Sequence, residues 1–532
     1  MKKNYLLFST LLFSLVVHAQ LSFTSQNFST QGSFKMCVVD MNGDYLDDIV
    51  TVSSNNVYIY QQTESGFELK TITTPSADNT PGWSFTAGDF NGDGYNDMLY
   101  GGGSGATFML SDGTGNGFLE KSPNNYIFSQ RANFVDINND GKLDAYVCHD
   151  VQPSVYFLNE GFNNMSFHQG GLGDYPSGGH YGSLWVDYNN DGHIDLHISK
   201  CGGEENRYTD NLYRNNGDGT FTEVAALANM DNKSQTWSTA WADFNNDGWM
   251  DAMIGVSSFS TGGHKLMKNN GDGTFSDVTA GSGLDTFNST SWEYIAVDFD
   301  NDGYVDIFGS GNKVLKNNGD MTFTPVSVGF STSSAGDLNN DGFVDVFTND
   351  KIYFNDGNSN NWIKIITVGT ESNRNGIGAR VEVYSELGKQ IRDVRSGEGF
   401  SQMGTLNTHL GIGSDTAISQ VIVRWPSGIV DTIENPAINE SLVIVEGSTI
   451  MAVNEVENVQ FSIYPNPVKE TLSIQGKSLE NSTYQIHHIT GSSVMAGTIS
   501  NGKINVKNLT KGIYVLTISK NGQKSSQKFI KQ

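Results

Sequence analysis

Cysteine is scarce in this sequence. Its 532 residues include only Cys37, Cys148 and Cys201, which lie far apart along the chain. Three scattered thiols are too few for a fold held by disulfides or for a zinc site with four cysteine ligands. We therefore expect buried free thiols and a fold that is stabilised in another way.

Positive charge is also in short supply. Lysine and arginine together number 32, against 58 aspartate and glutamate residues, so the formal net charge is −26. A protein that binds nucleic acid by neutralising phosphates needs the opposite balance. The charge excludes this class of function and favours cations as partners. Residues 451–532 differ from the rest, because they hold nine Lys and four Glu but no Asp.

Long apolar runs are absent after the first twenty residues, so the sequence predicts no transmembrane helix. The start of the chain has Lys2 and Lys3, an apolar run over residues 5–17, and the small-residue site Val17-His18-Ala19. This pattern predicts a signal peptide over residues 1–19. No cysteine follows the cleavage site to carry a lipid, so we expect a soluble mature chain outside the cytoplasm.

Glycine, by contrast, is abundant at 60 residues, and much of it lies in a repeated acidic pattern, D-x-N-x-D-G-x-x-D. Seven copies, here called acidic loops 1 to 7, begin 39 to 56 residues apart, which is a suitable spacing for repeated β-sheets. Positions 1, 3, 5 and 9 of each copy carry side-chain oxygens. In order, these residues are Asp40, Asn42, Asp44 and Asp48; Asp89, Asn91, Asp93 and Asp97; Asp136, Asn138, Asp140 and Asp144; Asp187, Asn189, Asp191 and Asp195; Asp243, Asn245, Asp247 and Asp251; Asp298, Asp300, Asp302 and Asp306; Asp337, Asn339, Asp341 and Asp345.

The spacing of these oxygens predicts calcium sites. Alternate residues at positions 1, 3 and 5 converge on one point, Gly at position 6 permits a sharp reversal, and the last Asp closes the shell. Oxygen ligands without His or Cys select calcium over zinc or copper, so we expect up to seven calcium ions. The loops lack the Glu of an EF-hand and lie among β-rich segments. Turn chemistry alone explains one copy but not seven. Loop 1 has Tyr45 instead of Gly at position 6, and we expect it to be the weakest site.

Four short strands are expected in each repeat. One precedes the acidic loop, two apolar runs follow it, and a turn such as Asn216-Gly217-Asp218-Gly219 leads into the last. Seven such units predict an all-β fold with a seven-bladed β-propeller over residues 20–360. The repeats resemble the FG-GAP or VCBS family of calcium-loop propellers, which includes the heads of integrin α-chains.

Function is expected on the face opposite the acidic loops, where the longer connections gather. The residues six positions before the loops include five aromatic ones, Phe34, Trp83, Tyr181, Trp237 and Trp292. They are candidates for stacking on a sugar or a partner's side chain around a central opening. The alternative is that these rings pack between blades.

The repeat stops at Asn361, and residues 361–447 predict a second, small β-rich domain. Its segments Gly376 to Arg380, Gly397-Glu398-Gly399-Phe400, His409 to Gly413 and Val423 to Gly428 resemble the ASPIC/UnbV domain of cartilage acidic protein-like chains. The resemblance implies no established chemistry. The basic residues of this domain suit either anion binding or, more simply, surface ion pairs. They are Arg374, Arg380, Arg395, His409 and Arg424.

A linker over residues 448–460 leads to a C-terminal β-sandwich over residues 461–532. The segments Tyr464-Pro465-Asn466-Pro467 and Lys511-Gly512-Ile513-Tyr514 resemble the C-terminal sorting domain of the type IX secretion system. The resemblance implies that the secretion machinery is a partner and that the chain crosses the inner and outer membranes to the cell surface or medium.

No catalytic motif emerges from the sequence. His193 and His197 flank Asp195 on one strand face, which would suit zinc, but packing is the simpler explanation. We expect a non-catalytic, calcium-binding recognition or adhesion protein with a glycan or extracellular protein ligand. The alternative is a calcium-dependent enzyme that acts on polysaccharides, such as a lyase.

Overall fold

The computed structural model describes residues 21–161, 164–331, 333–449, 461–476, 479, 482–489, 491–520 and 523–532. Nearly half of this part of the chain is β-strand, and its two helices, α1 (Glu205–Tyr208) and α2 (Ala225–Ala228), are four residues long. The all-β class is therefore confirmed. No helix in the described ranges has the length and hydropathy to cross a membrane. The predicted signal peptide and most of the predicted linker lie outside the described residues.

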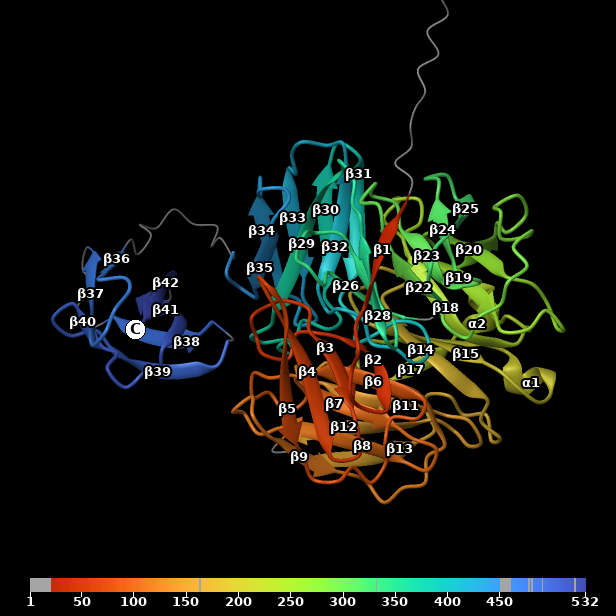
Figure 1. The fold of residues 1–532 in the computed structure, drawn as a ribbon, viewed down its shortest axis with the longest axis horizontal. Helices are drawn as coiled ribbons and strands as arrows, with labels where there is room; N and C mark the ends of the chain where they lie inside the picture. Colours follow the sequence, from red (N-terminus) through yellow and green to blue (C-terminus); the bar gives the residue numbers. More distant parts are fainter. Residues whose placement is uncertain are drawn as a thin grey trace, which may run out of the picture.

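The repeats form seven four-stranded antiparallel sheets, here called repeat sheets 1 to 7 (Figure 1). Sheets 1 to 3 contain β2 (Phe34–Val38), β3 (Ile49–Val52), β4 (Asn56–Thr63) and β5 (Gly66–Thr73); β6 (Ser84–Gly88), β7 (Asp97–Gly101), β8 (Ala106–Ser111) and β9 (Phe118–Lys121); β10 (Ser129–Val135), β11 (Asp144–His149), β12 (Val155–Gly161) and β13 (Asn164–Gln169). Sheets 4 to 6 contain β14 (His180–Val186), β15 (Asp195–Lys200), β16 (Asn211–Asn215) and β17 (Phe221–Glu223); β18 (Thr236–Ala242), β19 (Asp251–Val256), β20 (Lys265–Asn269) and β21 (Phe275–Asp277); β22 (Ile295–Val297), β23 (Asp306–Ser310), β24 (Lys313–Asn317) and β25 (Phe323–Ser327).

Repeat sheet 7 takes strands from both ends of the repeat region. It contains β26 (Ser334–Gly336), β27 (Asp345–Phe347) and β28 (Lys351–Asn355), and its fourth strand is the N-terminal β1 (Phe23–Asn27). The pairing of β1 with β28 runs from Phe23 opposite Asn355 to Asn27 opposite Lys351. Because the first strand completes the last sheet, residues more than 300 positions apart become neighbours.

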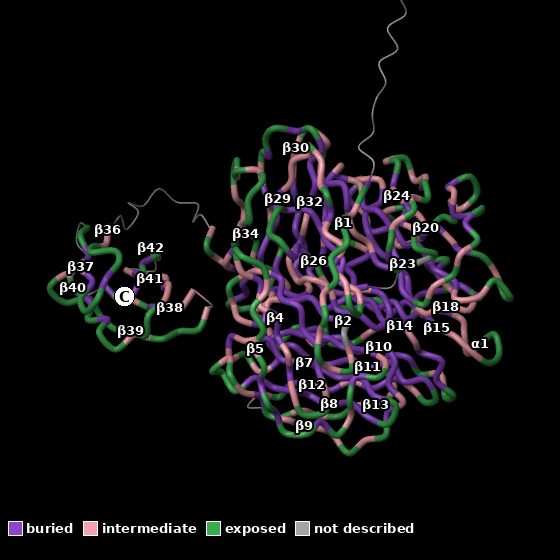
Figure 2. The backbone as a smooth tube through the Cα atoms, in the orientation of Figure 1, coloured by how far each residue is buried: buried purple, intermediate pink, exposed green. Residues whose placement is uncertain are grey.

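Each repeat sheet packs against the next through a buried apolar cluster. Separate clusters join sheets 1 and 2, 2 and 3, 3 and 4, 4 and 5, 5 and 6, and 6 and 7. A further cluster joins Val38, Ile49 and Tyr60 of sheet 1 to Phe347 and Ile352 of sheet 7. Figure 2 shows the buried backbone concentrated on the inner strands, while the outermost strands are more exposed.

The second module follows directly as two sheets. The first contains β29 (Asn361–Val368), β32 (Thr408–Gly413) and β35 (Ser441–Val445), and the second contains β30 (Arg380–Ser385), β31 (Gly388–Asp393), β33 (Gln420–Arg424) and β34 (Val430–Glu434). The module lies against the repeat sheets (Figure 1) and shares one large apolar cluster with sheets 2 and 3. This close packing was not expected from the sequence, which indicated only a separate domain.

Residues 394–407, which join β31 to β32 and are here called the central segment, contact the first strand of every repeat sheet. Backbone hydrogen bonds link Met403 to β2, Ser401 to β6 and Thr405 to β26. Side-chain hydrogen bonds add β10, β18 and β22. The ring of Phe400 lies 6.2 Å from that of Tyr181 in β14. One segment of the second module therefore contacts all seven repeat sheets.

The C-terminal residues form a tail module of two further sheets around one apolar cluster. Its strands are β36 (Phe461–Tyr464), β37 (Thr471–Gly476), β40 (Lys503–Asn505) in one sheet and β38 (Thr483–His488), β39 (Ser493–Thr498), β41 (Gly512–Lys520) and β42 (Gln523–Lys531) in the other.

Candidate cation sites and an aromatic cluster

The ninth residue anchors each acidic loop to its own sheet. In loop 5, Asp251 accepts hydrogen bonds from the backbone N–H groups of Phe244 at 3.2 Å and Asn269 at 2.8 Å. The same double acceptance occurs in all seven loops. All seven ninth-position carboxylates are fully buried. The residue predicted to close a metal shell therefore also joins the loop to the third strand.

The first residue organises the turn itself. Asp243 accepts hydrogen bonds from the N–H groups of Asp247 at 3.0 Å and Gly248 at 2.7 Å. The side chain at position 3 bonds to position 5, as Asn245 does to Asp247 at 2.9 Å. Hydrogen bonds thus tie positions 1, 3 and 5 of this loop to one another.

Loop 6 brings its carboxylates closest together. Oxygens of Asp298, Asp300 and Asp306 lie within 4.8 Å of one another, and all three residues are buried. It is the one such group of His, Cys, Asp or Glu found among the described residues. One oxygen each of Asp298 and Asp300 is buried without a hydrogen-bond partner. Three converging carboxylates with two unused oxygens fit a hard divalent cation.

Burial raises the pKa of many loop carboxylates and so disfavours their ionised form. It raises the pKa of Asp40, Asp89, Asp136, Asp187 and Asp243 to about 6. It raises the pKa of Asp48 and Asp251 to about 8, with neighbouring loop carboxylates adding to the shift. A bound cation would offset both the burial and the repulsion.

Basic side chains already touch several loops. Lys364 of β29 lies 2.9 Å from Asp337 of loop 7, and both side chains are almost fully buried. Arg374 approaches Asp89 of loop 2, while Lys316 of β24 contacts Asp300 and Asp302 of loop 6. The loops therefore differ in how much of their charge the protein itself neutralises.

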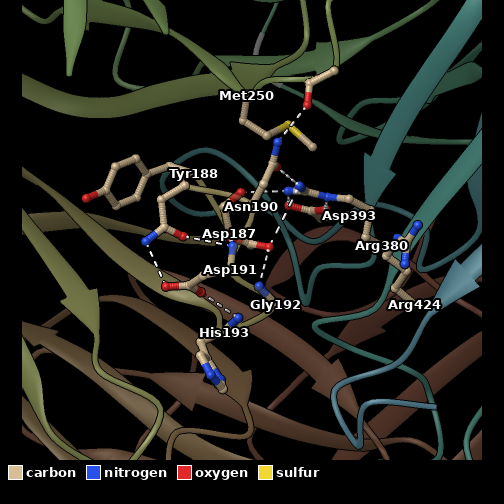
Figure 3. A network of polar contacts seen from close by, with 12 residues as sticks. Asp187, Tyr188, Asn190, Asp191, Gly192, His193, Met250, Arg380, Asp393 and Arg424 are labelled. Atoms are coloured by element: carbon tan, nitrogen blue, oxygen red, sulfur yellow. Dashed lines mark hydrogen bonds and ion pairs between the residues drawn. The ribbon is translucent and has the colours of Figure 1, made fainter. Parts of the chain in front are cut away.

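Arg380 of β30 is the basic side chain that contacts loop 4 (Figure 3). Its guanidinium donates to the carbonyl oxygen of Asp187 at 2.6 Å and to Asp393 Oδ1 at 2.8 Å, and it also contacts Asn190. Arg395 pairs with Glu398 and Arg424 with Glu382, both within the second module. Arg380 and Arg395 thus both contact Asp393, whereas Arg424 pairs separately with Glu382.

Three of the five predicted aromatic residues form one cluster. The ring of Trp237 lies 4.8 Å from that of Tyr181 and 5.8 Å from that of Trp292. Phe400 of the central segment completes the cluster at 4.9 Å from Trp237. Trp292 remains 52% exposed. The cluster, here called the aromatic cluster, presents the exposed indole of Trp292 beside the partly buried Tyr181 and Trp237 and the buried Phe400.

The other two candidates lie elsewhere. Phe34 contacts Phe85 at 6.0 Å between repeat sheets 1 and 2, and Trp83 contacts Phe128 at 6.0 Å. Phe34 therefore matches the alternative prediction of packing between sheets. His193 and His197 are not grouped with Asp195 as metal ligands within the described ranges, and the ring of His197 packs against Trp241.

Sequence reasoning missed a set of amides that join neighbouring sheets. Asn269, at the end of the third strand of sheet 5, donates to the carbonyl oxygen of Tyr188 in loop 4 at 2.8 Å. Equivalent bonds run from Asn159, Asn317, Asn355 and Gln62 to the preceding acidic loop, the last of them from sheet 1 to Asp337 of loop 7. The signal was present, because an Asn directly precedes most of the Asx-Gly turns.

Three family models match the chain. The one described as FG-GAP-like repeat matches residues 40–100, 89–147, 136–198, 187–254 and 298–348, together half of the chain. The model of ASPIC and UnbV matches residues 369–450, and that of the secretion system C-terminal sorting domain matches residues 462–532. The last match indicates export to the cell surface or secretion.

Curated relatives support the second assignment. Cartilage acidic protein 1 of Homo sapiens is 29% identical over 251 residues, covering 41% of this chain and 37% of the relative. The Xenopus tropicalis protein is 28% identical over 295 residues, covering 48% and 44%. The chain thus spans less than half the length of these relatives.

Solved structures show weaker similarity. An Agrocybe aegerita lectin that recognises non-reducing terminal N-acetylglucosamine has 19% identity and a TM-score of 0.40, over 60% of this chain and 88% of the lectin. PorZ of Porphyromonas gingivalis, a surface component of the type IX secretion system, has 10% identity and a TM-score of 0.21, over 95% and 82%. On the repeat match, which includes all seven acidic loops, the chain belongs to the FG-GAP-like repeat family.

Proposed function

We propose that this exported protein is a calcium-stabilised β-propeller that recognises a glycan or an extracellular protein without catalysing a reaction. The observation that carries the recognition role is the aromatic cluster, in which Trp292 stays 52% exposed beside Trp237. An indole with a free face suits stacking on a sugar ring or an apolar side chain. Export to the cell surface or medium would bring this surface to extracellular ligands.

The propeller is supported by contacts between the last repeat sheet and the first. Repeat sheet 7 packs against sheet 1, its outer strand is the N-terminal β1, and Gln62 donates from sheet 1 to loop 7. Seven sheets in a closed circle protect their inner edges from pairing with other chains. The central segment would then fill the middle of the circle.

Calcium is supported by the oxygen ligands of the acidic loops. The residues at positions 1, 3, 5 and 9 would hold the ion, and loop 6 offers the tightest carboxylate group. Bound calcium would neutralise buried carboxylates and so stabilise the folded sheets over the open chain. The ion's role in this proposal is structural.

The recognition role can be tested with a glycan array and a panel of extracellular matrix proteins. We expect Trp292→Ala to reduce binding at least tenfold, because stacking on an aromatic face contributes on the order of 1 kcal/mol or more beyond simple burial. Trp249→Ala is the matched control, since Trp249 lies in loop 5, away from the cluster, and packs beside Gly271.

Equal losses in both variants would count against the aromatic cluster. Release of unsaturated sugars from a polysaccharide by the wild-type protein would instead support the alternative of a lyase, and the assay should therefore include product analysis on plant and algal polysaccharides.

A further inference from the structure

A partly enclosed cavity of about 120 Å³ lies where the second module meets repeat sheets 6 and 7. β22 and β26 form one side of it, and the end of β31 with the central segment forms the other. The aromatic cluster is not part of its lining, which includes Asp298 of loop 6 and, of the basic candidates, Arg395 and His409. The cavity is thus a feature separate from the proposed recognition surface.

Many polar atoms that line this cavity have no partner. Both side-chain atoms of Gln402, both ring nitrogens of His409, Ser334 Oγ and Arg395 Nε are buried and make no hydrogen bond in the described structure. Leaving such atoms unpaired destabilises the folded protein. Their concentration around one space indicates that a polar species occupies it.

The charges around the cavity leave one arginine without a carboxylate at ion-pair distance. Arg395 pairs with Glu398 at 2.8 Å, and Asp393 pairs with Arg380 at 2.8 Å. Arg392 lines the cavity, has no ion pair within 4.0 Å among the described residues, and donates to the carbonyl oxygen of Ile391. Asp298, Asp243 and Glu398 attract the guanidinium only from beyond ion-pair distance, so it can accommodate a closer anion.

We propose that the cavity binds a small oxyanion, such as a carboxylate or phosphate, with Arg392 as its charged partner. Arg395 Nε and Gln402 Nε2 supply fixed N–H donors, while Ser334 and His409 each supply one more. The apolar residues Ile295 and Leu406 line the remainder and leave room for a short carbon chain.

The inference rests on the proposed calcium site in loop 6. Asp298 also lines the cavity, and without a cation its carboxylate would face the incoming anion. Calcium held by Asp298, Asp300 and Asp306 would remove that repulsion. Anion binding is therefore expected to be stronger when calcium is bound.

The experiment is isothermal titration calorimetry on the full mature chain. Calcium is titrated first into metal-free protein, and sodium acetate or sodium phosphate is then titrated separately at constant ionic strength. We expect saturable binding of one anion to the calcium-loaded protein; the two arms distinguish a carboxylate from a phosphate ligand. If calcium itself fails to bind, the proposed function is wrong. If calcium binds and neither anion does, only the cavity proposal is overturned.

Variants locate the site. Arg392→Gln should weaken binding about tenfold or more, the loss expected for one charge-assisted hydrogen bond. Arg424→Gln, which makes the same charge change on a half-exposed arginine of the same module, should leave the affinity within about twofold. Ser334→Ala removes one donor with little change in volume and should weaken anion binding about threefold or more. This variant tests the site if Arg392→Gln does not fold. Equal affinities in all variants would overturn the assignment.

Discussion

At the scale of single residues, the ninth Asp of each acidic loop has a role independent of any metal. Asp251 accepts two backbone N–H groups and is fully buried. In Asp251→Asn the amide nitrogen cannot accept, so one buried N–H loses its partner at a cost of about 1–3 kcal/mol. Urea denaturation in calcium-free buffer measures the loss. Asp272→Asn, on an exposed turn, is the control and should change stability far less; equal losses would refute the anchoring role.

Backbone conformation distinguishes loop 1 from its relatives. Tyr45 occupies position 6 with a φ of 72°, where loop 4 has Gly192 at 85°. Gly192 has no heavy atom within 4 Å of an added Cβ, so Gly192→Ala isolates backbone strain. We expect Gly192→Ala to lower the free energy of unfolding by about 1 kcal/mol. Tyr45→Gly should raise it by relieving similar backbone strain. Loss of the hydrogen bond from the Tyr45 hydroxyl to the carbonyl oxygen of Ile489 should offset part of that gain. Denaturant midpoints of both variants test this, and shifts of the same sign would contradict it.

Sequence reasoning at this scale succeeded where the chemistry was local. It located Gly at position 6, but it overlooked position 4, where Asn139, Asn190, Asn246, Asn301 and Asn340 also have positive φ. Asn is common in this conformation, and the recurring Asn was therefore a usable signal. The Asn190 amide also donates to the carbonyl oxygen of Gly248 in the next loop at 2.9 Å, a contact that only the fold creates.

At the scale of elements, the four strands per repeat were predictable because turns and apolar runs recur with a fixed order. The central segment was not, since its contacts join distant residues without any periodic pattern. Ser396, for example, accepts from and donates to Phe134, 262 positions away. Close packing explains the need for glycine in Gly397-Glu398-Gly399-Phe400. A Cβ on Gly399 would lie 2.4 Å from Glu293 Oε1.

Glu293 holds the tip of the central segment. Its buried carboxylate accepts N–H groups of Phe400, Ser401 and Gln402 at 2.9–3.3 Å. Glu293→Gln replaces one accepting oxygen by a donor, so we expect a loss of about 2 kcal/mol or more. Limited proteolysis near residue 400 and calorimetry measure the loosening of the segment. Glu371→Gln, on an exposed residue of the same module, is the control. If both variants melt and cleave alike, Glu293 is not the anchor.

At the scale of the whole molecule, the net charge of −26 and the buried loop carboxylates link folding to protons. Asp40, Asp89, Asp136, Asp187 and Asp243 have folded-state pKa values raised to about 6, and those of Asp48 and Asp251 are raised to about 8. In an unfolded chain these groups titrate near 4. Above about pH 4 the folded protein binds more protons than the unfolded chain. The free energy of unfolding therefore falls as the pH rises through the folded-state pKa values.

The metal-free protein should therefore melt at a higher temperature at pH 5 than at pH 8. The proposed calcium ions would compete with protons for the same loops, so their stabilising effect should be large at pH 8 and small at pH 5, where the carboxylates are mostly protonated. Differential scanning calorimetry of metal-free protein, with and without added calcium across this range, makes the comparison. Magnesium at equal concentration is the control for ionic strength, because its octahedral preference suits these loops less well. A calcium-induced rise in melting temperature that is the same at both pH values would mean that the ion binds elsewhere.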